Sequence, residues 1–226
     1  MTLAHLTNLA LHIGAGVIAM AIGFWLLAAR KGTAAHRKTG RIFVALTLLV
    51  CACAAIGNVF FRFLPLFAVL TVLVLYQLLS GWHVIYTRAD GPNRVDALLC
   101  ASATLGGAAL MPLVLAKGAG ESGLSVIYSS LGTLLFLLAY DALRWLFPRR
   151  WHATLWRYEH IYKLLASLFA MVSAAAGNLF PHAQPWSQLA PSALGIACIA
   201  WFFWREFNRS RLRAAPSLEP VASPAG

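Results

Sequence analysis

The sequence predicts an all-α membrane protein, a bundle of seven transmembrane helices with its N-terminus outside and its C-terminus in the cytoplasm. Of 226 residues, 60% are hydrophobic and only 11% are charged, and the mean hydropathy is +0.72. A soluble domain has about 45–50% apolar and about 25% charged residues. A chain this short cannot bury such an excess in a core of its own. The composition excludes a soluble enzyme, a secreted disulfide scaffold, a disordered protein and a water-soluble nucleic-acid binder.

Long uncharged runs place the helices, because a bilayer core needs about 20 residues of helix. The first run, residues 1–29, is much longer than the apolar region of a cleavable signal and has no basic residue before it, so we expect this helix to be retained. The last run, residues 164–204, contains two helices, because Pro181 and Pro185 interrupt it. The predicted spans lie near residues 4–29, 41–62, 65–87, 95–117, 123–146, 157–180 and 186–206.

The ends of these spans define a transmembrane domain of residues 1–210 and a tail of residues 211–226. The tail is rich in Pro and Ala, and we expect it to be disordered in the cytoplasm. None of the spans alternates apolar and polar residues, as the wall of a β-barrel does.

The distribution of basic residues predicts the orientation. Of the 18 Lys and Arg residues, all except Arg62 and Lys117 fall on the side of the first, third and fifth loops and the tail. The positive-inside rule places that side in the cytoplasm. The net charge of +11 then serves to orient the helices and to contact anionic lipid headgroups, and we expect no nucleic-acid partner.

Two segments match when the sequence is shifted by 120 residues, which suggests an internal repeat. Residues 48–60 and 168–180 share Leu, Ala-Ala, Gly-Asn and Phe at the same positions. The two helices run in the same direction, so the repeat would be parallel. Chance similarity between Ala-rich segments is the alternative. The pairs Gly57-Asn58 and Gly177-Asn178 are expected to close their helices in the left-handed conformation.

Small residues indicate which helix faces contact protein rather than lipid. Gly16, Ala19 and Gly23 form such a face on the first helix, and the sixth helix has alanines at residues 166, 170 and 174. We expect these two helices to be central in the bundle.

Polar residues within spans are costly and tend to face the bundle interior. Near the cytoplasmic side, His83 and His160 could ligate one haem b, or another metal ion, with Tyr76 and Asp141 beside them. Zinc or iron held by His36, His83, His160 and Asp141 is a weaker alternative, because the ligands are not closely spaced. The alternative without a cofactor is that Asp141 pairs with Arg144, and Glu159 with Lys163, along their own helices.

Two further groups are candidate sites. An outer polar cluster would combine Asn8 and His12, which share one face of the first helix, with Asn58 and Asn178; its alternative is a set of hydrogen bonds between helices. A basic cytoplasmic loop, residues 30–41, could bind anionic headgroups or a phosphate. Its candidate residues are His36, Arg37, Gly40 and Arg41.

Four short motifs span most of residues 11–180: Leu11-His12-Ile13 with Gly16; Arg30-Lys31-Gly32 followed by His36-Arg37 and Gly40-Arg41; Leu75-Tyr76 with Ser80-Gly81-Trp82; and Arg157 with His160. In these motifs the chain resembles the DUF2306 family of uncharacterised bacterial membrane proteins. The resemblance implies a multi-pass protein of the bacterial inner membrane, similar in outline to small membrane subunits of cytochromes and oxidoreductases. It implies no settled activity.

Three functional hypotheses follow. The first is a membrane redox protein with one haem b. The second is a transporter of ions or small molecules that uses the polar residues of both sides. The third is a non-catalytic subunit that assembles through its small-residue faces with a membrane partner or with further copies of itself. No motif of a stand-alone enzyme, such as G-x-S-x-G or a P-loop, is present.

Overall fold

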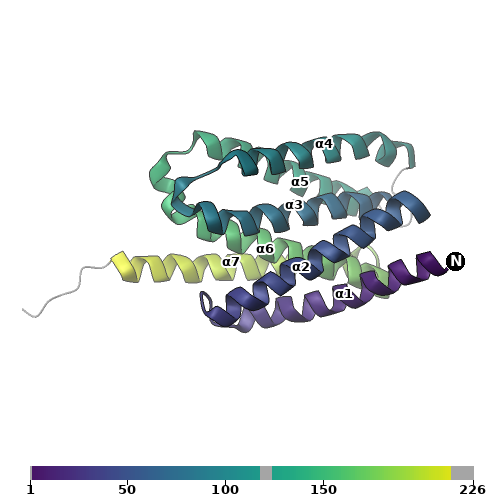
Figure 1. Cartoon of the computed structure of the whole chain (residues 1–226), viewed down its shortest axis with the longest axis horizontal. Helices are drawn as coiled ribbons and strands as arrows, with labels where there is room; N and C mark the ends of the chain where they lie inside the picture. Colours follow the sequence, from purple (N-terminus) through teal and green to yellow (C-terminus); the bar gives the residue numbers. More distant parts are fainter. Residues whose placement is uncertain (1, 118–123, 215–226) are drawn as a thin grey trace, which may run out of the picture.

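The computed structural model describes residues 2–117 and 124–214, and within these ranges it contains seven long helices and no strand. All seven are long and apolar enough to cross a membrane, as in a multi-pass membrane protein (Figure 1). They are α1 (Leu3–Ala28), α2 (Ala34–Ile56), α3 (Pro65–Thr87), α4 (Arg94–Lys117), α5 (Leu124–Leu143), α6 (Arg149–Leu179) and α7 (Trp186–Ala214).

Three helices extend beyond the predicted spans. α2 begins at Ala34 instead of residue 41, α6 begins at Arg149 instead of 157, and α7 continues to Ala214 instead of 206. The predicted spans end at charged residues, but a charged residue at the edge of an apolar run does not by itself end a helix. The Thr33 hydroxyl accepts the backbone N–H of His36 and caps α2. Residues 211–214 are therefore helical, contrary to the expectation of disorder, and 215–226 lie outside the described residues.

The helix at the centre of the bundle is α3, which contacts α2, α4, α5 and α6. α1 packs mainly against α2, and α7 packs mainly against α6 (Figure 1). The prediction that the first and sixth helices are central is thus wrong for α1. Its small-residue face does contact protein, because a Cβ atom on Gly23 would lie 2.5 Å from Leu168 Cδ1. The buried residues of α1 are Ala15, Ala19 and Gly23.

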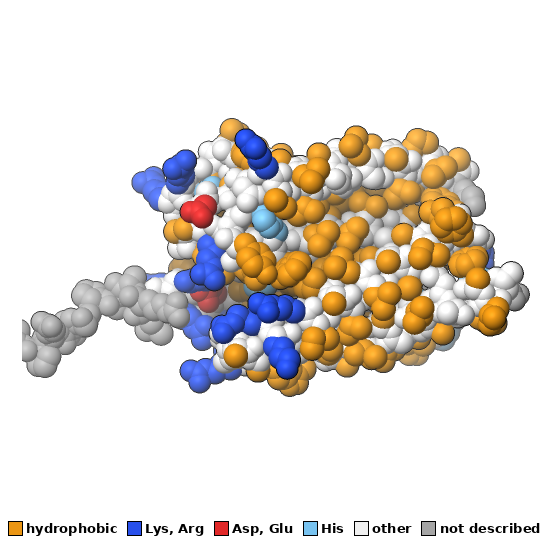
Figure 2. All heavy atoms as spheres, viewed as in Figure 1, with side chains coloured by type: hydrophobic (Ala, Val, Ile, Leu, Met, Phe, Trp, Pro, Cys, Tyr) orange, Lys and Arg blue, Asp and Glu red, His pale blue; other side chains and the backbone are white. Residues whose placement is uncertain are grey.

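The two ends of the bundle differ in chemistry. Most Lys and Arg side chains visible in Figure 2 lie at the end where α7 terminates. α2, α4 and α6 begin at this end and α1, α3 and α5 finish there; we call it the basic end. The opposite end of the α3–α4–α5 group is filled by buried apolar side chains, namely Leu66, Val69, Val114, Val126 and Ile127; we call these the apolar seal.

The expected left-handed helix ends at the two Gly-Asn pairs are wrong. Gly57 has φ −57°, and α2 continues from it as a π-helical turn, Gly57–Phe61. Gly177 lies inside α6, where a Cβ atom would overlap Gln188 Nε2. Position 177 requires glycine because α6 packs closely against α7 there, not because the backbone turns. α2 and α6 do run in the same direction (Figure 1), and the internal repeat stays a prediction.

Candidate functional site

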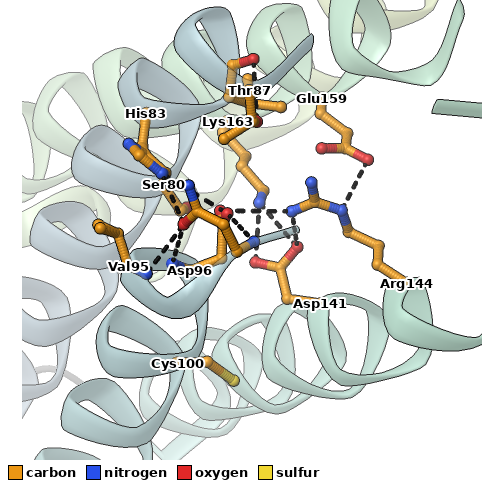
Figure 3. A network of polar contacts seen from close by, with 12 residues as sticks. Ser80, His83, Thr87, Val95, Asp96, Cys100, Asp141, Arg144, Glu159 and Lys163 are labelled. Atoms are coloured by element: carbon orange, nitrogen blue, oxygen red, sulfur yellow. Dashed lines mark hydrogen bonds and ion pairs between the residues drawn. The ribbon is translucent and has the colours of Figure 1, made fainter. Parts of the chain in front are cut away.

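The main polar feature is a group of five charged side chains buried between α4, α5 and α6 at the basic end (Figure 3). Side chains this polar are rare within membrane spans and mark functional positions. The group, which we call the buried charge cluster, consists of Asp96, Asp141, Arg144, Glu159 and Lys163. Lys163 is 0% exposed, Arg144 is 2% exposed and Glu159 is 3% exposed. These charges therefore depend on each other, not on water, for stabilisation.

Asp141, at the end of α5, is the most fully paired member of the cluster. Lys163 Nζ on α6 donates hydrogen bonds to Asp141 Oδ1 and Oδ2, at 2.8 and 2.7 Å. Arg144 Nη1 donates to Asp141 Oδ1 at 3.2 Å, and the Tyr76 hydroxyl on α3 donates to Oδ2. Two cations and a hydroxyl thus converge on one carboxylate, an arrangement of charge-assisted hydrogen bonds.

Arg144 connects Asp141 to the other two carboxylates (Figure 3). Its Nε lies 3.0 Å from Glu159 Oε1, and its Nη1 lies 3.8 Å from Asp96 Oδ1. The contact with Glu159 is an ion pair, and the hydrogen bond to Glu159 Oε1 comes from the Tyr140 hydroxyl, at 2.9 Å. The expected pairing along helices is therefore found only for Asp141 with Arg144. Glu159 pairs with Arg144 and not with Lys163, which bonds to Asp141.

The cluster holds more carboxylates than cations: three against two. Asp96 Oδ1 and Glu159 Oε2 are buried and have no hydrogen-bond partner in the described part of the chain. A buried carboxylate oxygen without a donor is unfavourable in a medium of low dielectric constant. The cluster thus has the composition of a site that can take up one more positive charge.

His83, one turn before the end of α3, connects the cluster to the surface of the basic end. Its Nε2 lies 3.1 Å from Asn93 Oδ1 and 3.6 Å from Asp96 Oδ2. Asn93 Oδ1 also accepts the backbone N–H groups of Val95 and Asp96, at 2.8 and 3.3 Å, so His83 Nε2 must be the donor to it. His83 is 19% exposed and Asn93 is exposed, whereas Asp96 is buried.

His160, on α6, contacts α3 at a different point from His83. Its Nδ1 donates to the carbonyl oxygen of Gly81 at 2.9 Å, which leaves Nε2 free to accept. A Cβ atom on Gly81 would overlap Leu164 Cδ2 and would lie 2.6 Å from Lys163 Cβ, so α3 and α6 touch at this point.

These contacts give a haem between His83 and His160 no support. The helices leave no gap for a porphyrin beside Gly81, and His83 Nε2 already donates to Asn93. In the described part of the chain, no group of three or more His, Cys, Asp or Glu side chains is arranged so that it could hold a metal ion. Of the four residues predicted around the cofactor, Tyr76 and Asp141 contact each other directly, and His83 is linked to them through Asp96 and Arg144.

The residues of the predicted outer polar cluster are bonded to backbone. His12 Nδ1 lies 3.1 Å from the Val50 carbonyl oxygen, and Asn8 Nδ2 donates to the Cys53 carbonyl oxygen at 3.0 Å. These two bonds join α1 to α2. Asn58 and Asn178 each donate to a carbonyl of their own helix, Ala54 and Ala174. Asn58 also accepts the N–H of Leu64 at the turn into α3.

The basic loop is shorter than expected because α2 begins within it. His36 and Arg37 belong to the first turn of α2, and Arg37 Nη1 donates to the Gly32 carbonyl oxygen at 2.7 Å. A Cβ atom on Gly40 would have no neighbour within 4 Å, and Arg41 is exposed. Gly32 has φ +78°, a conformation that favours glycine at the turn between α1 and α2.

Asp96 and Asn93 are not among the predicted site residues. Asn93-x-x-Asp96 resembles the reciprocal capping pair that begins many helices. The Asn93 N–H does donate to Asp96 Oδ2 at 2.9 Å, so the pair caps α4 as well. The pair also contacts His83 and Arg144. These contacts depend on how α3 and α5 pack against α4, and a local sequence pattern holds no information about that packing.

Comparison with protein-family models, with curated proteins and with solved structures finds no match to this chain.

Proposed function

We propose that this protein is a proton-coupled membrane transporter whose buried charge cluster takes up one proton from the cytoplasmic side. The observation that carries the proposal is the balance of three buried carboxylates against two cations. An unpaired charge in a medium of low dielectric constant is strongly unfavourable. A proton is the smallest cation that can remove it.

Asp96 and His83 are the residues that we assign to the exchangeable proton. Asp141 contacts two cations, whereas Asp96 has a buried oxygen without a hydrogen bond. His83 lies 3.6 Å from Asp96 and is partly exposed. An imidazole can accept a proton on one ring nitrogen and release one from the other, so His83 can pass a proton between water and Asp96.

The orientation in this proposal follows the positive-inside rule, with the basic end in the cytoplasm. The membrane is the bacterial inner membrane, as the resemblance to DUF2306 implies. On the other side of the cluster, α3, α4 and α5 are closed by the apolar seal. In a transporter that works by alternating access, each state opens the binding site to one side of the membrane and closes it to the other. The arrangement seen here fits the state that is open to the cytoplasm.

The experiment measures proton-driven charge movement in the reconstituted protein, which needs no knowledge of the transported substrate. Proteoliposomes are adsorbed on a solid-supported membrane, and the pH of the bathing solution is changed in one step. We expect a transient current in the wild type and its loss in Asp96→Asn. Asparagine keeps an oxygen that can accept the Asn93 N–H, so the cap of α4 is preserved.

The matched control is Asp90→Asn, which removes an exposed carboxylate at the same end of the bundle and should leave the current unchanged. His83→Gln is the second test and should slow or abolish the current. If the wild type gives no current above that of empty liposomes, or if Asp96→Asn equals the wild type, the transporter proposal is wrong. The first result would favour a non-catalytic subunit whose cluster only joins helices.

A further inference from the structure

A second group of cations lies at the basic end, between the α1–α2 turn, α6 and α7. Lys31 Nζ lies 4.8 Å from the centroid of the Phe202 ring, and the guanidinium carbon of Arg205 lies 5.9 Å from the same centroid. Two positively charged side chains thus lie near the same aromatic ring on α7. Cation–π attraction partly stabilises each of them, but it neutralises neither.

The polar partners of Lys31 are neutral as well. Its ammonium donates to the carbonyl oxygens of Leu26 and Leu27 at the end of α1. Those carbonyls lack partners within the helix, so the lysine caps α1. Partial burial of the ammonium, together with the nearby Arg205 charge, lowers the pKa of Lys31 from 10.5 to about 8. Lys31 is thus an exposed residue whose ammonium is favoured by the two carbonyl oxygens and disfavoured by the nearby Arg205 charge.

Two histidines and an arginine extend the group. His36 lies within electrostatic range of Lys31, Arg37 and His160. His36 Nδ1 is buried and has no hydrogen-bond partner in the described part of the chain. The nearest glutamate along α7, Glu206, is paired at 3.0 Å with Arg157. We call Lys31, Arg37 and Arg205, together with the neighbouring imidazoles of His36 and His160, the cation group.

The cation group differs from the buried charge cluster in its lack of counter-charges. Every cation of the buried charge cluster contacts at least one carboxylate. In the described contacts of Lys31, His36 and Arg205, no carboxylate takes part. Like charges gathered without a counter-charge repel one another unless an anion from outside the chain joins them.

We propose that the cation group binds a phosphate group, that of an anionic lipid headgroup at the surface of the basic end. Lys31 follows the end of α1, and Arg205 lies at the end of the span predicted over residues 186–206, where headgroup phosphates are expected. An ammonium and a guanidinium from different elements can contact different oxygens of one phosphate. A bound phosphate would also link α7 to α1 and α2, two helices that α7 contacts little elsewhere. This inference does not depend on the proposed function.

The experiment measures the thermal stability of the purified protein in a nonionic detergent with added ligand. Mixed micelles with phosphatidylglycerol are compared with those containing phosphatidylcholine, and inorganic phosphate alone is the third condition. A ligand that binds only the folded state raises Tm in a saturable way. We expect this rise with phosphatidylglycerol and not with phosphatidylcholine. An equal rise with inorganic phosphate would identify free phosphate as the source of the bound group.

The variants are Arg205→Gln and the double variant Lys31→Gln/Arg205→Gln, with Arg150→Gln as the control. Arg205 is exposed near the end of α7, so its replacement leaves the core intact, and Arg150 is an exposed arginine at the same end. We expect the apparent affinity for phosphatidylglycerol to fall at least ~10-fold in the double variant, a change of about 1.4 kcal/mol, and to stay unchanged in Arg150→Gln. The proposal is wrong if no condition gives a saturable rise in the wild type, or if the double variant binds as the wild type does.

Discussion

Lys163 on α6 donates hydrogen bonds to both carboxylate oxygens of Asp141 on α5, at 2.7 and 2.8 Å. Glu159 and Lys163 stand at positions i and i+4 in the sequence, a spacing that favours a pair along one helix. The structure instead uses each of these residues to bind a partner at the end of α5 or in the turn that follows it. The buried charge cluster therefore joins α5 and the turn after it to α6.

Replacing Lys163 with methionine should be strongly destabilising, because it leaves the buried Asp141 carboxylate with one cation. We expect a loss of about 3–5 kcal/mol in the free energy of unfolding, as for other broken buried pairs. Adding Asp141→Asn to Lys163→Met should restore part of the loss. Chemical unfolding in detergent of the two single variants and the double variant measures this coupling. Strictly additive effects would show that the two side chains do not interact.

Alanine at position 81 should separate α3 from α6. Its Cβ atom would overlap Leu164 Cδ2 and would lie 2.6 Å from Lys163 Cβ, too close for either helix to remain in place. We expect a cost of about 1–3 kcal/mol, typical of overpacking. The matched control is Gly132→Ala on α5, where nothing beyond the adjacent backbone of its own helix lies within 4 Å of the new Cβ. Equal melting temperatures for the two variants would contradict this prediction.

The stability of the lipid-free protein should depend on pH through Lys31. Its folded pKa of about 8 lies below its ordinary value of 10.5, so between these values the unfolded chain binds more protons. Stability then rises as pH increases from about 8 to about 10.5. The neighbouring charge is Arg205, and the imidazoles of His36 and His160 lie nearby but carry no charge in this pH range. Melting curves over this pH range should show the rise in the wild type and a smaller one in Lys31→Gln.

The exposed Lys38 of α2 supplies the control for this pH dependence. Lys38→Gln should retain the rise of the wild type, since its side chain has no described part in the cation group. Saturating phosphatidylglycerol should reduce the rise in the wild type, because a bound anion favours the protonated ammonium. A rise of the same size in Lys31→Gln would assign the pH dependence to other groups.

His12 should prove to be a structural residue. Its ring nitrogen bonds to the Val50 carbonyl oxygen and joins α1 to α2. We expect His12→Ala to lower the free energy of unfolding by about 0.5–1.5 kcal/mol, the net value of one hydrogen bond. The current evoked by a pH step should be retained in this variant. If the current is lost while the protein still folds, the outer polar residues belong to the transport pathway after all.

The sequence predicted the number and approximate positions of the helices because hydropathy is a local property. It failed at the ends of α2, α6 and α7, where a charge marks the edge of the bilayer but does not end a helix. It named Tyr76, Asp141 and His83, because a polar residue inside an apolar run is conspicuous. It missed Asp96, whose position at the start of α4 is already explained by a helix cap. Pairs such as Glu159 with Arg144 follow from helix packing, which no local pattern specifies.

The apolar seal at the far end of α3, α4 and α5 has an electrical consequence. The voltage across a membrane falls mainly over layers of low dielectric constant, and Leu66, Val69 and Ile127 form such a layer. A proton that enters the proposed site from the basic end therefore crosses little of the field, so loading is nearly independent of voltage and the current evoked by a pH step should come mainly from release through the seal. Release through the seal would cross most of the field, at about 2.3 kcal/mol per charge for each 100 mV. In the proposed cycle, the membrane potential acts on the step that opens the seal and not on the step that loads the site.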